Sequence, residues 1–595
     1  PFIATKLSVI KGSASIRYGS DAIGGVVLVE PADLPTYKSM SGEINLIGMD
    51  NSRMYCGSGI LQGAIGDSSL SYRVQGTYRR SGTLEAPNYN LDNTGTLEQN
   101  YSAALGYSKA HYGITAYYSH FYTEIGINRN TDAGNGTQLL EVFALTKPVI
   151  DSAFTYQIQR GYQSVLHDMV KLSAFVKYTN FGKLELTYAW QTDNRLEYSL
   201  DVPYSVSGSL NNAPENDFNL VTNTAELVWE HNPIGHITGS IGADFMNQGN
   251  IYTGLAYSPV IPNYVSYSGG LFIIEKWSIT NKFLLEGGIR YDDKWQQEYM
   301  LNPTTLGKYS NIQSYNSTTA TIGATYQLSS KFSLDANAGN GWRAPSVYEL
   351  YAYGIHGATA TFEVGDSMLK VEKSYDLSTS LHYESEKLFA EIGVYANYIN
   401  NYIYLQPQAG KPDAEIQTIE GYFPRFDFTQ TDALFKGVDF DVKWHITKHL
   451  QYEPKVTLVY ANDLTNHDYL VLIPPQRLQN SVEYRWRKLG KFSNVFISLG
   501  NTYVAKQTRV PPNSDFVPPP NGYDLFFAAI GLSMPLGNQE MSISIQGNNL
   551  TNTAYRDYLD FFRYYADEPG RSIQLKIRIP FQVFSNKSQQ QTSNQ

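Results

Sequence analysis

Residues 6–30 read KLSVIKGSASIRYGSDAIGGVVLVE, in which two short apolar runs flank a glycine-rich turn. The first run lies within Leu7–Ile10 and the second within Ile23–Val29. Such runs predict two small buried strands joined by a tight connection. The glycines between them allow positive φ angles or close backbone contacts. Taken alone, this pattern fits a turn of an α/β protein as well as a turn of an all-β protein.

The stretch as a whole resembles the end of the plug domain of TonB-dependent outer-membrane receptors, which typically reads V-x-K-G-P-x-S-x-x-Y-G-x-x-A-x-G-G-V-x-N. The residues that carry the resemblance are Lys11, Gly12, Arg17, Tyr18, Gly19, Asp21, Gly24 and Gly25. Ser13 stands where the family usually has proline, and Leu28-Val29-Glu30 replaces the usual ending. The resemblance implies a plug segment inside a barrel, where we expect Ile23, Val26 and Val27 to pack against other plug strands.

Composition restricts the class of protein. The chain has 595 residues, with 45 Lys+Arg against 55 Asp+Glu and a formal charge of −10, so no basic patch for nucleic acid is expected. Only 17% of residues are charged, whereas 14% are aromatic and 47 are tyrosine. Tyrosine suits a surface that is half apolar and half wet, such as a membrane interface. The single cysteine, Cys56, excludes an internal disulfide framework.

Alternation of apolar and polar residues is the dominant pattern from residue 42 onward. In residues 572–579, SIQLKIRI, every odd position is apolar and every even position is polar. Residues 182–190 and 541–548 repeat this period of two, which a helix would not hold. No run of about 18 apolar residues exists, so only closed strands remain as a way across a membrane. The pattern therefore predicts an all-β fold, a transmembrane antiparallel β-barrel of about 22 strands. The resemblance of residues 6–30 adds a partial plug domain at its N-terminus.

Soluble all-β folds are the alternatives to this barrel. A propeller would show a blade motif at a period of about 40 to 50 residues, and none is present. A sandwich is too small for the length of chain that shows no domain break. A closed barrel with roughly 25 residues per strand and connection absorbs that length.

We expect four segments along the chain. Residues 1–31 are the C-terminal end of the plug, 32–41 a linker, 42–581 the barrel and 582–595 a disordered tail rich in Ser, Gln and Asn. The chain opens within an apparent domain, so we expect it to be a fragment that lacks a secretion signal and most of the plug. Residues 328–331 and 384–387 are predicted turns at the periplasmic end, and residues 201–218, 252–267 and 504–521 are predicted extracellular loops.

Two further stretches resemble the same family. Residues 341–351, GWRAPSVYELY, are similar to the receptor barrel's G-[FW]-R-A-P-x-x-x-E-L. Residues 549–555, NLTNTAY, with Pro569-Gly570-Arg571 and a final alternating strand, resemble the closing box of the family, in which Phe581 takes the place of the terminal aromatic residue.

The stretch after Arg343 is the predicted ligand-binding loop. Pro345 should end the strand and hold Ala344 extended, because proline cannot donate to the ladder. The loop candidates are Arg343, Glu349, Tyr351, Tyr353, His356, Glu363 and Asp366. A very similar run occurs in zinc and metal-chelate receptors of the family, so the resemblance implies a metal-linked solute with His356 and Glu363 as metal ligands. The alternative is that His356 and Glu363 only hold the loop against its neighbours. For Arg343, the alternative is an ion-paired arginine of the barrel.

Motifs for enzymatic chemistry are absent from the sequence. It has no G-x-S-x-G, H-E-x-x-H or G-x-x-x-x-G-K-[ST] string, and two histidines four apart, His445 and His449, make a weak metal signal. We therefore predict no enzyme and no cofactor.

The family resemblance implies a specific kind of transport. It implies a receptor that captures a siderophore or other metal chelate and imports it with proton-motive force through TonB, by way of a TonB box missing from this chain. The expected setting is the lipid of a Gram-negative outer membrane, as a monomer with no nucleic-acid partner. A zinc, haem or cobalamin receptor of the same family remains an alternative, as does a passive porin, with a barrel lipase as a distant third.

Overall fold

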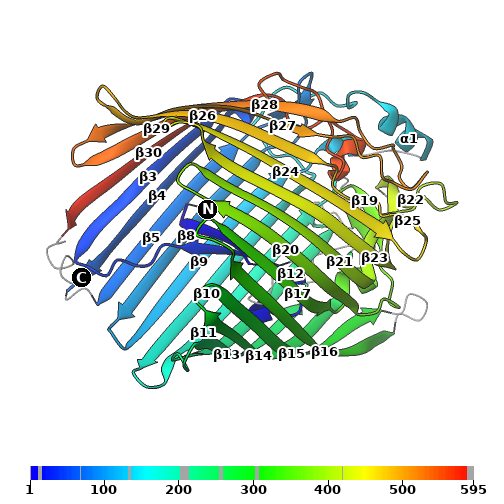
Figure 1. Cartoon of the computed structure of the whole chain (residues 1–595). Helices are drawn as coiled ribbons and strands as arrows, with labels where there is room; N and C mark the ends of the chain where they lie inside the picture. Colours follow the sequence, from blue (N-terminus) through cyan, green and yellow to red (C-terminus); the bar gives the residue numbers. More distant parts are fainter. Residues whose placement is uncertain are drawn as a thin grey trace.

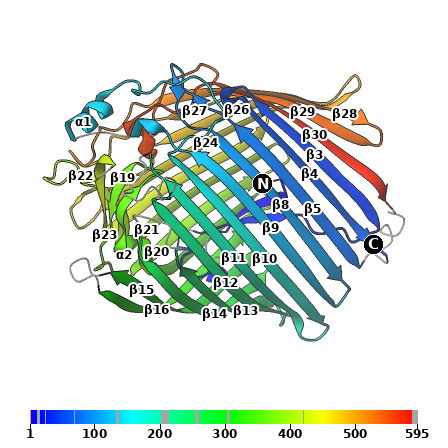
Figure 2. The same ribbon diagram turned by 180° about the vertical axis from the view of Figure 1, so that it is seen from behind.

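The computed structural model describes residues 2–10, 16–23, 25–66, 69–131, 136–200, 213–252, 259–301, 307–418 and 420–585. Within these residues, 22 strands form the wall of one closed antiparallel barrel, so the predicted fold class is confirmed (Figures 1 and 2). They are β3 (Ser39–Met49), β4 (Met54–Ile65), β5 (Leu70–Ser81), β8 (Thr96–Ser108), β9 (Tyr112–Gly126), β10 (Tyr162–Tyr178), β11 (Gly182–Tyr198), β12 (Asn216–His231), β13 (Ile237–Asn250), β14 (Asn263–Thr280), β15 (Phe283–Leu301), β16 (Lys308–Gln327), β17 (Phe332–Arg343), β20 (Glu372–Glu384), β21 (Leu388–Pro407), β23 (Gly421–His445), β24 (Leu450–Asp463), β26 (Arg477–Leu489), β27 (Phe492–Val504), β28 (Tyr523–Leu536), β29 (Gln539–Asn548) and β30 (Ser572–Ser585).

Smaller elements lie in the connections and at the N-terminus. They are β1 (Ala4–Ile10), β2 (Val26–Pro31), β6 (Leu84–Glu85), β7 (Asn90–Leu91), β18 (Tyr353–His356), β19 (Thr361–Val364), β22 (Glu415–Thr418), β25 (Asp468–Tyr469), α1 (Gly136–Ala144), α2 (Val347–Tyr351) and the short 3₁₀ turns η2 (Asn51–Arg53), η3 (Arg129–Thr131) and η4 (Phe561–Tyr564). No helix in the described part of the chain has the length and apolar character needed to cross a bilayer.

Connection length distinguishes the two ends of the barrel. The predicted turns at 328–331 and 384–387 join β16 to β17 and β20 to β21, and both lie at the end with short connections. The long connections, with α1, β19, β22 and β25, gather at the other end (Figures 1 and 2). This asymmetry is typical of outer-membrane barrels, whose long loops are extracellular.

Two predicted loops are shorter than expected. Strand β12 begins at Asn216, and residues 201–212 of the loop before it lie outside the described residues. Strand β14 begins at Asn263, because Val265 and Tyr267 continue the ladder opposite Gln297 and Trp295.

The two faces of β30 differ as the alternation predicts. Ile573 and Leu575 are 43% and 42% exposed on the outer face. Lys576 and Arg578 instead line a lumenal cavity, where an Arg578 nitrogen lies 2.6 Å from Glu43 Oε2. The outer face thus meets lipid with apolar side chains, while Arg578 on the inner face pairs with Glu43.

The segment boundaries differ from those expected. The first wall strand begins at Ser39, inside the predicted linker 32–41, and the last runs to Ser585, into the predicted tail 582–595. Ser39 and Met40 pair with Ser585 and Phe584, so the ladder continues where composition suggested a tail. Residues 586–595 lie outside the described residues.

Strands β1 and β2 form a separate two-stranded sheet inside the barrel (Figures 1 and 2). We call residues 2–31 the plug segment. The side chain of Val27 is 61% exposed, as are the neighbouring Val9 at 62% and Val29 at 62%, so its packing against further plug strands stays a prediction. Among the described residues β2 pairs only with β1, and this face of the sheet stays uncovered.

Candidate functional site

The loop between β17 and β20 starts where the sequence predicts. Ala344 and Pro345 follow the last residue of β17, and Ser346 then caps α2. Ser346 Oγ accepts a hydrogen bond from the Glu349 amide at 3.2 Å, and the Ser346 amide donates to Glu349 Oε2 at 2.7 Å. This capping box fixes the exit from the strand.

Arg343 joins this loop to the wall. One of its nitrogens lies 2.9 Å from Glu349 Oε2 and another lies 3.1 Å from Glu372 Oε2, at the start of β20. Both carboxylates are largely buried, at 13% and 5% of side-chain exposure. The side chain therefore acts as an internal tie, as the ion-pair alternative holds.

His356 and Glu363 lie opposite the helix α2, on the β18–β19 hairpin. His356 Nδ1 donates to Glu363 Oε1 at 2.9 Å, Tyr348 donates its hydroxyl to Glu363 Oε2 at 2.6 Å, and Thr361 Oγ1 donates to Oε1 at 3.0 Å. Glu363 is only 2% exposed, so these donors occupy it in a dry setting. No three Cys, His, Asp or Glu side chains come together as a potential metal site in the described ranges.

The His356–Glu363 contact shifts the pKa of both groups. Burial lowers the pKa of His356, but the hydrogen bond and charge of Glu363 outweigh it, so the pKa of His356 is raised. Burial likewise raises the pKa of Glu363, but its bonds to His356, Tyr348 and Thr361 outweigh that, so the pKa of Glu363 is lowered. Both shifts favour the charged pair.

The other loop candidates do not converge on one point. Tyr351 accepts a 2.6 Å hydrogen bond from Asn311 of β16, and the Asp366 side chain accepts one from the Met368 amide. Tyr353 is 70% exposed and packs edge-on against Phe362. The candidates thus hold the loop in place, and Tyr353 alone among these three offers a large exposed surface.

The plug motif fastens the plug segment to the wall. Arg17 makes two hydrogen bonds to Glu226 of β12, at 2.8 and 2.9 Å. Ile16 is 3% exposed in a cluster with Val228, Phe272 and Ile274. An Arg290 nitrogen donates to the Arg17 carbonyl at 3.3 Å.

Gly19 and Gly25 of this motif serve the turn, as expected. Gly19 and Gly25 have φ of +94° and +110°, a region that favours glycine. Tyr18 and Asp21 are exposed. Lys11, Gly12 and Gly24 lie outside the described residues.

The structure also contains an aromatic cluster among the loops that was not predicted from the sequence. The loop cluster consists of Leu139, Val142, Phe143, Ala360, Phe426, Tyr564 and Tyr565, with Phe516 and Phe561 packed against it. Phe143 lies 5.2 and 5.3 Å from the rings of Tyr564 and Tyr565. Asp515 accepts a 2.6 Å hydrogen bond from Tyr564 and pairs with Arg563. The run FFRYY at 561–565 was the available signal, since four aromatic residues inside a loop need an apolar partner.

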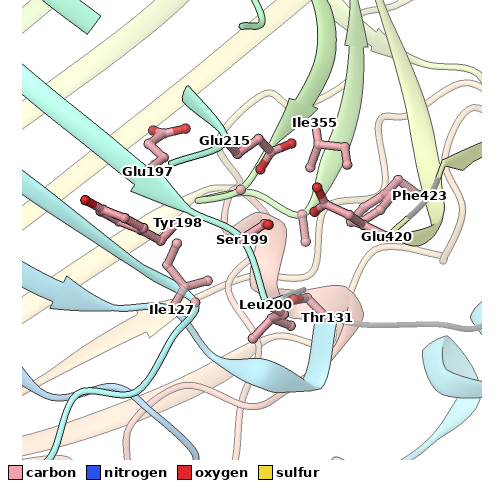
Figure 3. Close-up of a pocket in the computed structure, with 13 residues that line it drawn as sticks. Ile127, Thr131, Glu197, Tyr198, Ser199, Leu200, Glu215, Ile355, Glu420 and Phe423 are labelled. Carbon is pink, nitrogen blue, oxygen red and sulfur yellow. The ribbon is translucent and has the colours of Figure 1, made fainter. Parts of the chain in front are cut away.

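A cavity of about 40 Å³ lies beside this cluster, and sequence reasoning missed it too. Its lining includes Glu197, Glu215 and Glu420, which come from three separate parts of the chain (Figure 3). Glu215 is 1% exposed, and burial together with the charges of Glu420 and Glu197 raises the pKa of Glu215 to about 9. No local motif could reveal a site whose members lie so far apart in sequence.

Comparison with known proteins completes this description. Residues 57–550 match the family model "TonB dependent receptor-like, beta-barrel". Among solved structures, a copper transporter, OprC, is similar with a TM-score of 0.76 at 17% identity, covering 98% of this chain and 86% of that one. A mutant of the ferric enterobactin receptor PfeA of Pseudomonas aeruginosa is similar with a TM-score of 0.70 at 16% identity, covering 97% of this chain and 85% of that one. The FrpB iron transporter of Neisseria meningitidis is similar with a TM-score of 0.72 at 14% identity, covering 98% of this chain and 89% of that one.

Proposed function

Because this chain belongs to the TonB-dependent receptor family, an outer-membrane family of Gram-negative transporters rather than enzymes, we propose that it imports a siderophore or another metal chelate into the periplasm. TonB supplies the energy from the proton-motive force, through a TonB box outside residues 1–595, and the chain acts as a monomer. The polypeptide itself then needs no nucleotide site.

One observation supports the proposal beyond the family match: the described residues of the range 2–31 lie inside the closed barrel, and Arg17 ties them to its wall (Figure 1). Arg17 and Glu226 share two charge-assisted hydrogen bonds, and Ile16 is buried against β12 and β14. A passive porin has no need of a segment fastened across its lumen. An energised receptor does, because its path opens only when such a segment moves.

The metal chelate is favoured by relatives and by the resemblance of the ligand loop. OprC is a copper transporter, PfeA a ferric enterobactin receptor and FrpB an iron transporter. These relatives are less than 20% identical to this chain and support its fold. The identity of the solute is therefore to be determined by the uptake experiment.

Uptake by a deletion strain tests the function. The strain should lose energy-dependent uptake of one member of a panel of ferric siderophores, copper chelates, zinc, haem and cobalamin, and the restored gene should return it. If the restored strain still takes up the solute after the proton-motive force is collapsed, the protein is a porin.

The metal role of the loop has its own test. At equal surface expression, His356→Ala and Glu363→Ala should weaken binding of the metal chelate to whole cells if these side chains touch it. Unchanged affinity for every chelate would leave the pair with its structural task of pinning the hairpin, and Tyr353→Ala would be the next variant because that ring is exposed.

A further inference from the structure

A group of arginine and aromatic side chains lies on the barrel wall, at the end of β4 and β5 that carries the long connections. Its members come from the η2 turn, from the two strands and from the loop before β10. The ladder places Tyr55 opposite Arg80, and the ring of Tyr156 packs edge-on against that of Tyr55, with the ring centres 6.1 Å apart. We call this group the rim patch, and it consists of Arg53, Tyr55, Tyr78, Arg80, Phe154 and Tyr156.

The alternation of each strand directs the rim patch outward. Ile60 and Arg73 line a lumenal cavity, so the even positions of β4 and the odd positions of β5 face inward. Tyr55, Tyr78 and Arg80 have the opposite parity and therefore face away from the lumen. Tyr55 is 49% exposed and Tyr78 is 44% exposed, so the rest of the described chain leaves both rings open to the surroundings of the barrel.

Aromatic rings indicate the depth of the rim patch in the membrane. Tyr55 and Tyr78 stack with their ring centres 6.2 Å apart, and Tyr101 on the next strand, β8, is exposed as well. Closer to the middle of the wall the outward side chains are apolar, as the exposed Val74 of β5 shows. Tyrosines at the border of the apolar band of a barrel lie at the level of the lipid headgroups. The two arginines stand on the outer side of these rings and therefore face headgroups.

Both arginines of the rim patch are positioned by neutral groups. The guanidinium of Arg53 lies 3.9 Å from the centre of the Phe154 ring, and Arg80 donates to the carbonyl of Tyr156. Tyr156 also donates its hydroxyl to the Arg53 carbonyl at 2.6 Å, so one residue bridges the two arginines. Arg53 has a φ of +43°, an unfavourable value for a residue other than glycine, so this side chain is presented at a conformational cost.

The charges of the two arginines are not balanced by ion pairs within the protein. Among the residues that the structure describes, neither Arg53 nor Arg80 pairs with a carboxylate, although Asp50 and Glu85 belong to the same connections. Asp50 Oδ1 instead accepts hydrogen bonds from two backbone amides, both at 2.6 Å. Arg79, which precedes Arg80 and faces the lumen, differs because it pairs with a glutamate of β8 at 2.9 Å. The rim patch thus offers guanidinium donors that no anion of the described chain occupies.

We infer that the rim patch binds a phosphomonoester group on an outer-leaflet lipid, with Arg53 and Arg80 as its donors. A guanidinium presents its N–H groups in a planar fork that matches the oxygens of a phosphate. The adjacent tyrosine rings offer a flat surface, partly apolar and partly polar, to the rest of the headgroup. The occupant is a lipid, because the apolar band beside the patch holds the acyl chains while the headgroup meets the arginines. The inference goes beyond the proposed transport, since this surface lies outside the lumen.

Retention of radiolabelled lipid A, a phosphorylated and acylated disaccharide, by the immobilised, detergent-solubilised chain tests the inference. We expect saturable retention of lipid A, weaker retention when NaCl is raised from 0.1 to 0.5 M, and no retention of lipid A from which the phosphates have been removed. An equal concentration of inorganic phosphate should not displace the lipid. The double variant Arg53→Gln with Arg80→Gln should weaken retention at least tenfold, and each single variant should weaken it less.

Arg79→Gln is the matched control, because it removes the same charge one residue away on the lumenal face. It should retain lipid A as the native chain does, and heat-modifiable migration on gels would check that every variant keeps its barrel. Equal retention by the double variant and the native chain, equal retention of the dephosphorylated lipid, or a loss in Arg79→Gln as large as in the double variant would each overturn the inference. Displacement by inorganic phosphate would also overturn it, since the patch would then take a soluble anion.

Discussion

The loop cluster lies among the long connections at one end of the barrel and the plug segment lies inside the barrel, and different forces hold them. Phe143, Tyr564 and Tyr565 in the loop cluster are at most 6% exposed and pack ring against ring. The plug segment buries Ile16 and otherwise depends on polar contacts such as Arg17 with Glu226. Its larger apolar side chains, Leu7 and Val9 among them, remain exposed.

This difference indicates which part is built to move. Separating an apolar cluster exposes surface to water at about 25 cal/mol per Å², with no compensating bond. Separating an ion pair in a wet lumen costs less, because water and salt replace the lost partners. The loop cluster should therefore stay in place, while the plug segment is held by polar bonds that water and salt can replace.

The largest expected effect is in the loop cluster. Phe143→Ala should lower local stability by about 3–5 kcal/mol, because it leaves a cavity among packed rings. Native-state trypsin cleavage at Arg556 and Arg563 would measure the opening. Leu140→Ala on the same helix is the control, since Leu140 is 51% exposed, and an equal loss for both variants would contradict the packing of α1.

The wall that supports both regions comes next. A lysine on the lipid face costs about 2–4 kcal/mol at the bilayer midplane and less toward the interfaces, so Leu575→Lys on the outer face should destabilise the barrel, while Gln574→Lys should be nearly silent. Reversible unfolding from lipid vesicles would measure both. If the two variants respond alike, the register of β30 or the membrane assignment is wrong.

A smaller effect is expected at the plug segment. Removing Arg17 and Glu226 singly and together should give a coupling of about 1–2 kcal/mol, because the bonds are charge-assisted but partly exposed. Trypsin cleavage after Lys6, a site that all three variants keep, would report detachment. Raising NaCl from 0.1 to 1 M should speed this cleavage and leave that of the loop cluster unchanged, and the opposite ranking would reverse the comparison.

The smallest effect concerns the β18–β19 hairpin, which is outside the wall. The raised pKa of His356 adds stability below pH 6.5 that is lost as pH rises through its folded value. The lowered pKa of Glu363 adds stability above pH 4.5 that is lost as pH falls through its folded value. Protease resistance of this loop should therefore peak between about pH 4.5 and 6.5 and decline on either side.

His356→Gln tests the alkaline side of that profile. The variant should lose the decline above pH 6.5, since glutamine does not titrate there, while the acidic side persists through Glu363. A native decline that survives in His356→Gln would assign it to another group.

Local sequence patterns predicted the strands of the wall but not the contacts across the lumen, and one physical reason explains both outcomes. The alternation in residues 572–579 marks two faces of a strand, because successive side chains point to opposite sides. It does not say which strands face each other across the interior. Arg17 and Glu226 are 209 residues apart, so the motif located the plug segment but not its partner.

The ligand loop shows the same limit at shorter range. Pro345 correctly marked the end of β17, because proline cannot continue a ladder. The acceptor role of Glu363 toward Tyr348 depends on how α2 folds back over the hairpin, which the spacing does not encode. Glu215 is harder still, since its setting is made by residues near 197 and 420.

The seam between β3 and β30 governs the order in which this chain can fold. Ile44 pairs with Ile579 and Leu46 with Ile577, so the first and last wall strands are neighbours. Hairpins such as β16–β17 can form early from local contacts, whereas this seam has the longest loop to close and forms slowly. Until residue 585 has been made, β3 presents an unpaired edge, and an unpaired edge recruits other chains. Ring closure is therefore an event of the finished polypeptide, and the nascent chain has to be kept from aggregating until its last strand arrives.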